Sequence, residues 1–158
     1  MIRWGVLGTA HINRRVIPAM RAARCSTVLA VASRDLRRAQ AYAREWAIES
    51  VHGSYDALLH DRTIDAVYIP LPNSAHVEWT LRALDAGKHV LCEKPLALVP
   101  DDVDRIAAVA SAQSLVVAEA FMYRHEPLIA RAGAGAGGLA RSDSVARGGV
   151  HISSESNA

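Results

Sequence analysis

The sequence predicts an α/β protein built on a doubly wound parallel sheet. Five short runs rich in Val, Ile and Leu recur up to Ala120, and such near-continuous apolar runs are typical of strands buried on both faces of a parallel sheet. Segments with helical spacing separate these runs. Strands that alternate with helices of this length form right-handed βαβ units, which place helices on both faces of one sheet.

Each predicted element has its own signal in the sequence. The apolar runs predict strands at Ile2–Leu7, Thr27–Ala32, Asp65–Pro70, Lys88–Cys92 and Leu115–Ala120. Apolar residues at helical spacing predict helices at His11–Arg24, Asp35–Ala47, Ser54–His60, Ser74–Ala86 and Pro100–Gln113. We expect Asp35, Ser74 and Asp101 to cap the starts of three of these helices, and Gly87 to end the helix at Ser74–Ala86.

Composition excludes several classes of protein. The chain has 158 residues, of which 51% are hydrophobic and 22% charged, as in one globular domain. A formal net charge of +2 gives no strong attraction to nucleic acid or membrane, so neither is expected as a partner. Cys25 and Cys92 form neither a metal-binding spacing nor a disulfide framework. No apolar run reaches the length of a membrane span and no signal-peptide layout is present, so we expect a cytoplasmic protein.

The turn after the first predicted strand carries a dinucleotide-binding pattern. Such a turn needs a glycine where the strand ends, a small residue beside the pyrophosphate and another where helix meets strand. Gly8 fits the first requirement and Ala10 the second, whereas Asn13 departs from the third. The alternative is a plain tight turn between strand and helix. The candidate cofactor-binding residues of this turn are Gly8, Thr9, Ala10, His11 and Ile12.

The residues after the second predicted strand bear on the choice of dinucleotide. An acidic side chain here would bind the adenosine ribose diol, and an arginine would accommodate a 2′-phosphate. Arg34 comes first, and Asp35 is expected to serve as a helix cap. The pattern therefore favours NADP over NAD, with Ser33, Arg34 and Arg38 as the binding residues. The alternative is a solvated basic face in an arginine-rich chain.

The fourth predicted strand leads into Glu93-Lys94-Pro95. Lys94 falls at the carboxyl edge of the sheet, where open α/β sheets bind ligands. Pro95 biases the backbone of Lys94 toward an extended conformation, and Glu93 should point to the opposite face. A positive nicotinamide nearby would favour the neutral amine, which can act as a general base. The alternative is an ordinary strand-end lysine exposed to solvent, which is our interpretation of Lys88.

Other catalytic classes fail on spacing. A short-chain dehydrogenase needs Tyr-x-x-x-Lys, but Leu84 and Val90 stand four residues before the two lysines. A P-loop needs Gly-Lys followed by Ser or Thr, but His89 follows Gly87-Lys88. The chain has no Cys-x-x-Cys and no His-Glu-x-x-His, so no metal site is expected.

Taken together, these motifs resemble the glucose–fructose oxidoreductase, inositol dehydrogenase and rhizopine-catabolism (Gfo/Idh/MocA) family. The version seen here is most similar to the branch of NADP-dependent xylose and trans-dihydrodiol dehydrogenases. The resemblance covers about residues 1–128, and its matching segments are Gly-Val-Leu-Gly-Thr-Ala at 5–10, Ser33-Arg34-Asp35, Asp65-Ala-Val-Tyr-Ile-Pro-Leu-Pro-Asn-Ser74, Glu93-Lys94-Pro95 and Glu119-Ala-Phe-Met-Tyr-Arg124.

This resemblance implies a Rossmann domain that binds NADP, with NAD as the alternative cofactor. In such enzymes the lysine of Glu-Lys-Pro contacts substrate and nicotinamide, so Lys94 is the expected catalytic residue. Tyr123 and Arg124, with Phe121, would approach the substrate. The resemblance also implies that full-length relatives form homo-oligomers. The cofactor-binding residues expected in the third and fourth units are Leu71, Asn73, His76, Glu93 and Lys94.

The sequence after residue 128 departs from the family pattern. Family members continue into a second α/β domain that binds substrate, whereas here a segment rich in Gly, Ala, Arg and Ser follows. We therefore predict a nucleotide-binding domain at 1–128, a disordered tail at 129–158, and no second domain. One face of the sheet should then expose apolar surface.

Three functional hypotheses follow. The first is an oxidoreductase that transfers hydride between NADP(H) and a CH–OH carbon of a sugar, polyol or diol, here reduced to its nucleotide-binding half. The second is a nucleotide-binding module without catalysis. The third is a Rossmann domain for a different nucleotide-like ligand, such as S-adenosylmethionine. Because the substrate-selecting residues would lie in the second domain, the sequence does not name the substrate.

Overall fold

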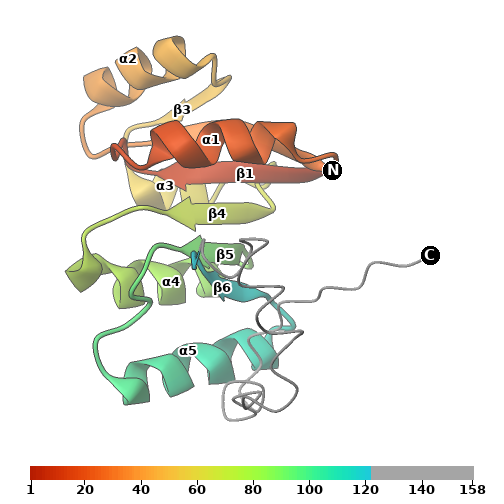
Figure 1. Cartoon of the computed structure of the whole chain (residues 1–158), viewed down its shortest axis with the longest axis vertical. Helices are drawn as coiled ribbons and strands as arrows, with labels where there is room; N and C mark the ends of the chain where they lie inside the picture. Colours follow the sequence, from red (N-terminus) through yellow and green to blue (C-terminus); the bar gives the residue numbers. More distant parts are fainter. Residues whose placement is uncertain (122–158) are drawn as a thin grey trace, which may run out of the picture.

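The computed structural model describes residues 1–121 and contains one six-stranded parallel sheet. Its strand order is β3-β2-β1-β4-β5-β6 (Figure 1). The strands are β1 (Ile2–Leu7), β2 (Ser26–Ala32), β3 (Ser50–His52), β4 (Ala66–Ile69), β5 (His89–Cys92) and β6 (Val117–Glu119). The helices are α1 (Asn13–Ala22), α2 (Leu36–Trp46), α3 (Tyr55–Leu59), the 3₁₀ turn η1 (Asn73–Ala75), α4 (His76–Asp85) and α5 (Pro100–Ala112).

Helices cover both faces of the sheet, which confirms the predicted doubly wound arrangement. One core packs α1 and α2 against Val6 and Tyr68. The other packs the helices α3, α4 and α5 against Leu7 and Val67. Neighbouring residues of one strand thus enter opposite cores, because successive side chains in a strand point to opposite faces.

The strand order reverses direction at β1. From β1 the chain first builds outward through β2 and β3, and then returns to place β4 on the other side of β1. Such a reversal opens a crevice at the carboxyl ends of the strands, and open α/β sheets bind their ligands there. The fold therefore points to the turns that follow β1, β2, β4 and β5.

Helix ends agree with some of the predicted caps and correct others. Asp35 caps α2, where its carboxylate accepts hydrogen bonds from the backbone N–H groups of Arg37 and Arg38 at 2.9 and 3.3 Å. Gly87 follows α4 with φ +72°, a conformation suited to glycine. The predictions for Ser74 and Asp101 were wrong. Ser74 lies within η1, and Asp101 lies inside α5. The helix α5 begins at Pro100, and the residue before it, Val99, provides no side-chain cap.

The prediction of five strands missed β3. This strand has three residues, Ser50–His52, and all three are half-buried at the sheet edge. A short edge strand adds few apolar side chains to the core, so the sequence has no apolar run there. The short helix predicted at Ser54–His60 is confirmed as α3, with the Ser54 hydroxyl accepting from Ala57 N–H at 3.1 Å.

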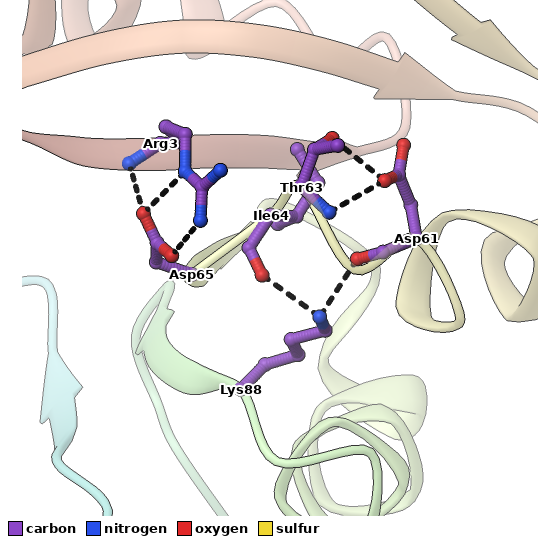
Figure 2. Close-up of polar contacts among 6 residues, drawn as sticks. All are labelled: Arg3, Asp61, Thr63, Ile64, Asp65 and Lys88. Atoms are coloured by element: carbon purple, nitrogen blue, oxygen red, sulfur yellow. Dashed lines mark hydrogen bonds and ion pairs between the residues drawn. The ribbon is translucent and has the colours of Figure 1, made fainter.

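Lys88 is not the solvent-exposed lysine predicted from the sequence. Only 7% of it is exposed, and its ammonium donates to the backbone carbonyls of Asp61 and Ile64 at 2.7 and 2.8 Å (Figure 2). Burial lowers the pKa of Lys88. Beside it, Arg3 donates from its backbone and guanidinium to Asp65, and these bonds lower the pKa of the Asp65 carboxyl. This polar group joins β1, the α3–β4 loop and β5.

Two sets of predictions lie outside the described residues. These are the substrate contacts Tyr123 and Arg124 and the tail at 129–158. Within residues 1–121, none of the helices combines the length and the apolar character that a membrane span requires.

Candidate dinucleotide-binding site

The turn between β1 and α1 is shaped around Gly8. Gly8 has φ +105°, a backbone conformation that residues other than glycine rarely adopt. A Cβ added to Gly8 would lie 3.2 Å from Leu71 Cδ2. The side-chain amide of Asn13 donates to the Gly8 carbonyl at 3.1 Å, and Asn13 is fully buried. Asn13 departs from the small-residue pattern, and as the first residue of α1 it holds the turn through this hydrogen bond.

The start of α1 is available to an anion. The helix has no side-chain cap and no acidic residue in its first turn. The positive end of the helix dipole is therefore not neutralised by the protein itself. A cavity of about 420 Å³ lies here between α1 and α2, and its lining residues are Thr9, Ala10, His11, Arg14, Arg38, Ala41, Tyr42 and Glu45.

The structure thus brings Arg38 together with the Gly8 turn, as the sequence predicted, and adds Arg14 and Tyr42, which sequence reasoning missed. Both added residues stand on helical faces that carry no motif. Arg14 forms an ion pair with Glu45 across the two helices at 3.3 Å.

The segment after β2 leaves Arg34 as its free charge. Asp35 is engaged as the cap of α2, and its own N–H donates to the Ser33 hydroxyl at 3.2 Å. Ser33 is buried, whereas Arg34 is exposed. The carboxylate that could bind a ribose diol is thus tied to backbone N–H groups, and a guanidinium suited to a phosphate remains.

The turn after β5 presents Lys94 on a fixed backbone. Lys94 is exposed, and side chains of neighbouring strands hold Glu93, directly before it, and Leu96, two positions after it. Glu93 accepts a hydrogen bond from the Tyr68 hydroxyl at 2.6 Å, and Glu119 accepts one from Leu96 N–H at 3.0 Å. Burial, together with the Glu93 carboxylate, raises the pKa of Tyr68. Sequence reasoning also placed Glu93 near the cofactor, and that role stays a prediction; in the structure its carboxylate accepts the Tyr68 bond.

His76 joins the turn after β4 to the turn after β5. It is fully buried at the start of α4. Its Nε2 lies 2.7 Å from the Leu71 carbonyl oxygen, and its Nδ1 lies 2.7 Å from the Pro95 carbonyl oxygen. Asn73 is exposed in η1 and lies between Leu71 and His76 in the sequence. The residues predicted from the third and fourth units therefore do gather at one edge.

A second, apolar cavity lies on one face of the sheet. It measures about 760 Å³ and runs beside α1 over β4, β5 and β6, with Tyr68, Leu91 and Ala118 contributing one residue from each strand. Phe121, the last described residue, also lines it. Within residues 1–121 the walls of this cavity are mostly apolar. That a missing second domain leaves this face exposed stays a prediction.

The fold and this edge define a dinucleotide-binding Rossmann domain. Within residues 1–121 there is no cluster of three or more His, Cys, Asp and Glu that could hold a metal. A family model described as "Oxidoreductase family, NAD-binding Rossmann fold" matches residues 2–121. The chain belongs to this family, GFO_IDH_MocA, and the resemblance drawn from the motifs is confirmed.

Over the aligned part, nearly half of the residues are identical between this chain and two named relatives. D-xylose 1-dehydrogenase (NADP(+)) 2 of Haloferax volcanii is 48% identical over 130 residues, 82% of this chain and 40% of the relative. A dTDP-3,4-didehydro-2,6-dideoxy-alpha-D-glucose 3-reductase of Actinomadura kijaniata is 46% identical over 127 residues, 80% of this chain and 38% of the relative.

A solved structure shows the same fold. KijD10, a 3-ketoreductase from Actinomadura kijaniata in complex with NADP, superposes with a TM-score of 0.79 at 44% identity. The match covers 85% of this chain and 43% of KijD10. The chain therefore spans about two fifths of the length of the proteins it matches.

Proposed function

We propose that this chain binds NADP(H) and forms the nucleotide-binding part of an oxidoreductase acting on a CH–OH carbon of a sugar, polyol or diol. The observation that carries the proposal is the pairing, at one sheet edge, of an uncapped helix start beside Gly8 with a free Arg34. These residues fit a dinucleotide: Gly8 permits the tight turn that leads into α1, whose start can accept a pyrophosphate, and Arg34 can bind a 2′-phosphate.

The cofactor, when bound, supplies hydride transfer at its nicotinamide ring. The chain's own part in the chemistry falls to Lys94, whose amine would hold or accept the proton of the substrate hydroxyl. Named relatives support the substrate class, since they include a xylose dehydrogenase and a keto-sugar reductase. A binding module without turnover is the second candidate, because the Gly8 turn and Arg34 concern cofactor binding alone.

The chain offers a direct test because it contains only two lysines, Lys88 and Lys94. Lys88 is buried and hydrogen-bonded, so reductive methylation with ¹³C-formaldehyde should label Lys94 and the amino terminus. The variant Lys94→Arg identifies the Lys94 signal by its disappearance. We expect NADPH to shift this signal in the NMR spectrum and S-adenosylmethionine to leave it unchanged. A chain that binds neither NADPH nor NADH would contradict the proposal.

The preference for NADP is tested by Arg34→Asp. A hydrogen bond to a charged group contributes about 1.5–3 kcal/mol, so NADPH affinity should fall roughly 10- to 100-fold while NADH affinity is retained. Arg37→Asp makes the same charge change three residues further on, on the exposed surface of α2, and should cost less than about threefold. Equal affinity of the unmodified chain for NADPH and NADH would argue against NADP as the cofactor.

Turnover separates the two candidates. Once NADPH binding is established, purified chain is assayed with sugars, polyols and diols. Steady turnover that disappears in Lys94→Ala supports the oxidoreductase, and binding without turnover supports the module.

A further inference from the structure

We infer that His76 is a positioning residue that locks the Leu71 turn to the Lys94 turn, and so fixes where the Lys94 amine stands. The inference rests on the proposed function, because it gives Lys94 its role at the cofactor. His76 itself is fully buried and both of its ring nitrogens face backbone oxygens, so it acts through the two turns.

The contacts of His76 are specific to the two turns. Both distances are 2.7 Å, and both partners are carbonyl oxygens, which only accept hydrogen bonds. In either neutral tautomer one nitrogen donates and the other faces an oxygen, whereas the doubly protonated ring donates to both. Leu71 belongs to the turn that contacts Gly8, and Pro95 follows Lys94 directly. One side chain therefore connects the Leu71 turn, which lies beside Gly8, to the Lys94 turn.

Neighbouring strands hold the rest of the Lys94 turn. Tyr68 of β4 binds the Glu93 carboxylate, Glu93 N–H donates to the Ile69 carbonyl at 3.1 Å, and Glu119 of β6 binds Leu96 N–H. These bonds fix the turn against the sheet. The bond from His76 differs because it fixes this turn relative to the turn after β4. Positioning of this kind matters where a small displacement of a reacting group lowers activity.

The test compares His76→Phe with Thr80→Val. Thr80 is also fully buried in α4, one turn further along, so its variant controls for lost packing of the helix. Two quantities are measured: hydrogen exchange of the Glu93 and Leu96 amides, and the response of the ¹³C-methylated Lys94 signal to saturating NADPH. Melting temperatures show that both variants are folded.

We expect His76→Phe to speed exchange at the two amides about tenfold more than Thr80→Val does. NADPH should still bind through the Gly8 turn and Arg34, but the shift of the Lys94 signal should be lost. Exchange and signal indistinguishable from those of Thr80→Val would overturn the inference. Should His76→Phe not fold, His76→Gln, which keeps one donor group, is compared by the same two criteria.

The outcomes also separate this inference from the proposed function. If the unmodified chain does not bind NADPH, the proposed function fails, and exchange at Glu93 and Leu96 in the free chain still decides whether His76 locks the turns. If NADPH binds and the exchange of His76→Phe matches the control, only the inference fails.

Discussion

The two lysines show how residues of one type take different roles in this fold. Lys88 is buried under the α3–β4 loop, and Lys94 is exposed at the opposite edge of the sheet. Lys88 directly precedes β5 and Lys94 follows it by two residues, and the neighbouring sequence does not show which of the two is buried. The Lys88 ammonium can be buried because it donates to two backbone carbonyls, those of Asp61 and Ile64.

Removing the Lys88 ammonium should destabilise the protein. Lys88→Met keeps the aliphatic stem but leaves the Asp61 and Ile64 carbonyls without this donor, which costs about 1–3 kcal/mol. The matched variant Lys94→Met changes an exposed residue and should shift the unfolding free energy by less than about 0.5 kcal/mol. Urea denaturation measures both. Equal effects of the two substitutions would contradict the role given to Lys88.

Asp65 gives the acid stability of the protein a defined direction. The Arg3 guanidinium and N–H lower the pKa of the Asp65 carboxyl below its ordinary value of about 4. The folded state therefore favours the carboxylate, and this stabilisation is complete above the ordinary pKa and lost as pH falls toward the folded pKa. The urea midpoint of Asp65→Asn should lie below that of the unmodified chain at neutral pH and approach it in acid. A gap that is constant through the acid range would refute this.

Some of the site residues could be predicted from local sequence, and others could not. Gly8 and Asp35 act through the backbone next to them, so a turn and a cap were enough to identify their positions. The role of Arg34 at a phosphate stays a prediction. His76 and Lys88 acquire their contacts from segments 19 to 27 residues away in sequence. No local pattern encodes such contacts, and only the packing of the sheet reveals them.

At the scale of elements, the β1–α1 turn depends on one glycine. The φ of +105° at Gly8 is strained for any side chain, so Gly8→Ala should destabilise the protein by about 1–3 kcal/mol. Gly53→Ala is the control, because Gly53 has no positive φ and its Cβ would meet Leu36 at an ordinary 3.6 Å. Urea denaturation compares the two.

The same turn should also fail to bind cofactor when it is enlarged. Gly8→Val places a branched side chain where a pyrophosphate would approach the backbone, so NADPH binding should be lost. Titration of NADPH fluorescence measures the affinity. Normal affinity in a folded Gly8→Val chain would show that the dinucleotide does not use this turn.

Elements with apolar runs were predictable, and elements without them were not. The run that became β4 is buried at every residue, β1 is buried over its last three residues, and β5 alternates buried with half-buried residues. Their hydrophobicity was enough to identify these strands. The strand β3 is short, half-buried and at the edge, and the spacing between α2 and α3 was the signal that could have found it. The helices α1 and α4 begin two residues later than predicted, and η1 takes the place of the expected start of α4. The helix α5 begins at Pro100 as predicted, without the expected Asp101 cap.

At the scale of the whole molecule, the apolar cavity beside α1 offers a surface for self-association. Its walls are apolar and it lies over β4, β5 and β6. A lysine on this face should reduce binding of the dye ANS and self-association of the chain. We expect this result for Ala118→Lys, which lines the cavity, and no change for Val116→Lys, which is exposed before β6 and does not line it. Fluorescence titration and sedimentation velocity make the comparison, and identical behaviour of the two variants would rule the cavity out as the cause.

The position of β1 in the middle of the sheet has a consequence for how the chain assembles as it is synthesised. The pairing of β1 with β2 closes across a single helix, whereas the bond from Arg3 to Asp65 closes a loop of 62 residues. Local contacts form sooner than distant ones, because loop closure costs more entropy over longer separations. The unit from β1 to β3 should therefore form first and offer the free side of β1 as a template. Strands β4, β5 and β6 would then add to it one after another, in the order in which the ribosome delivers them.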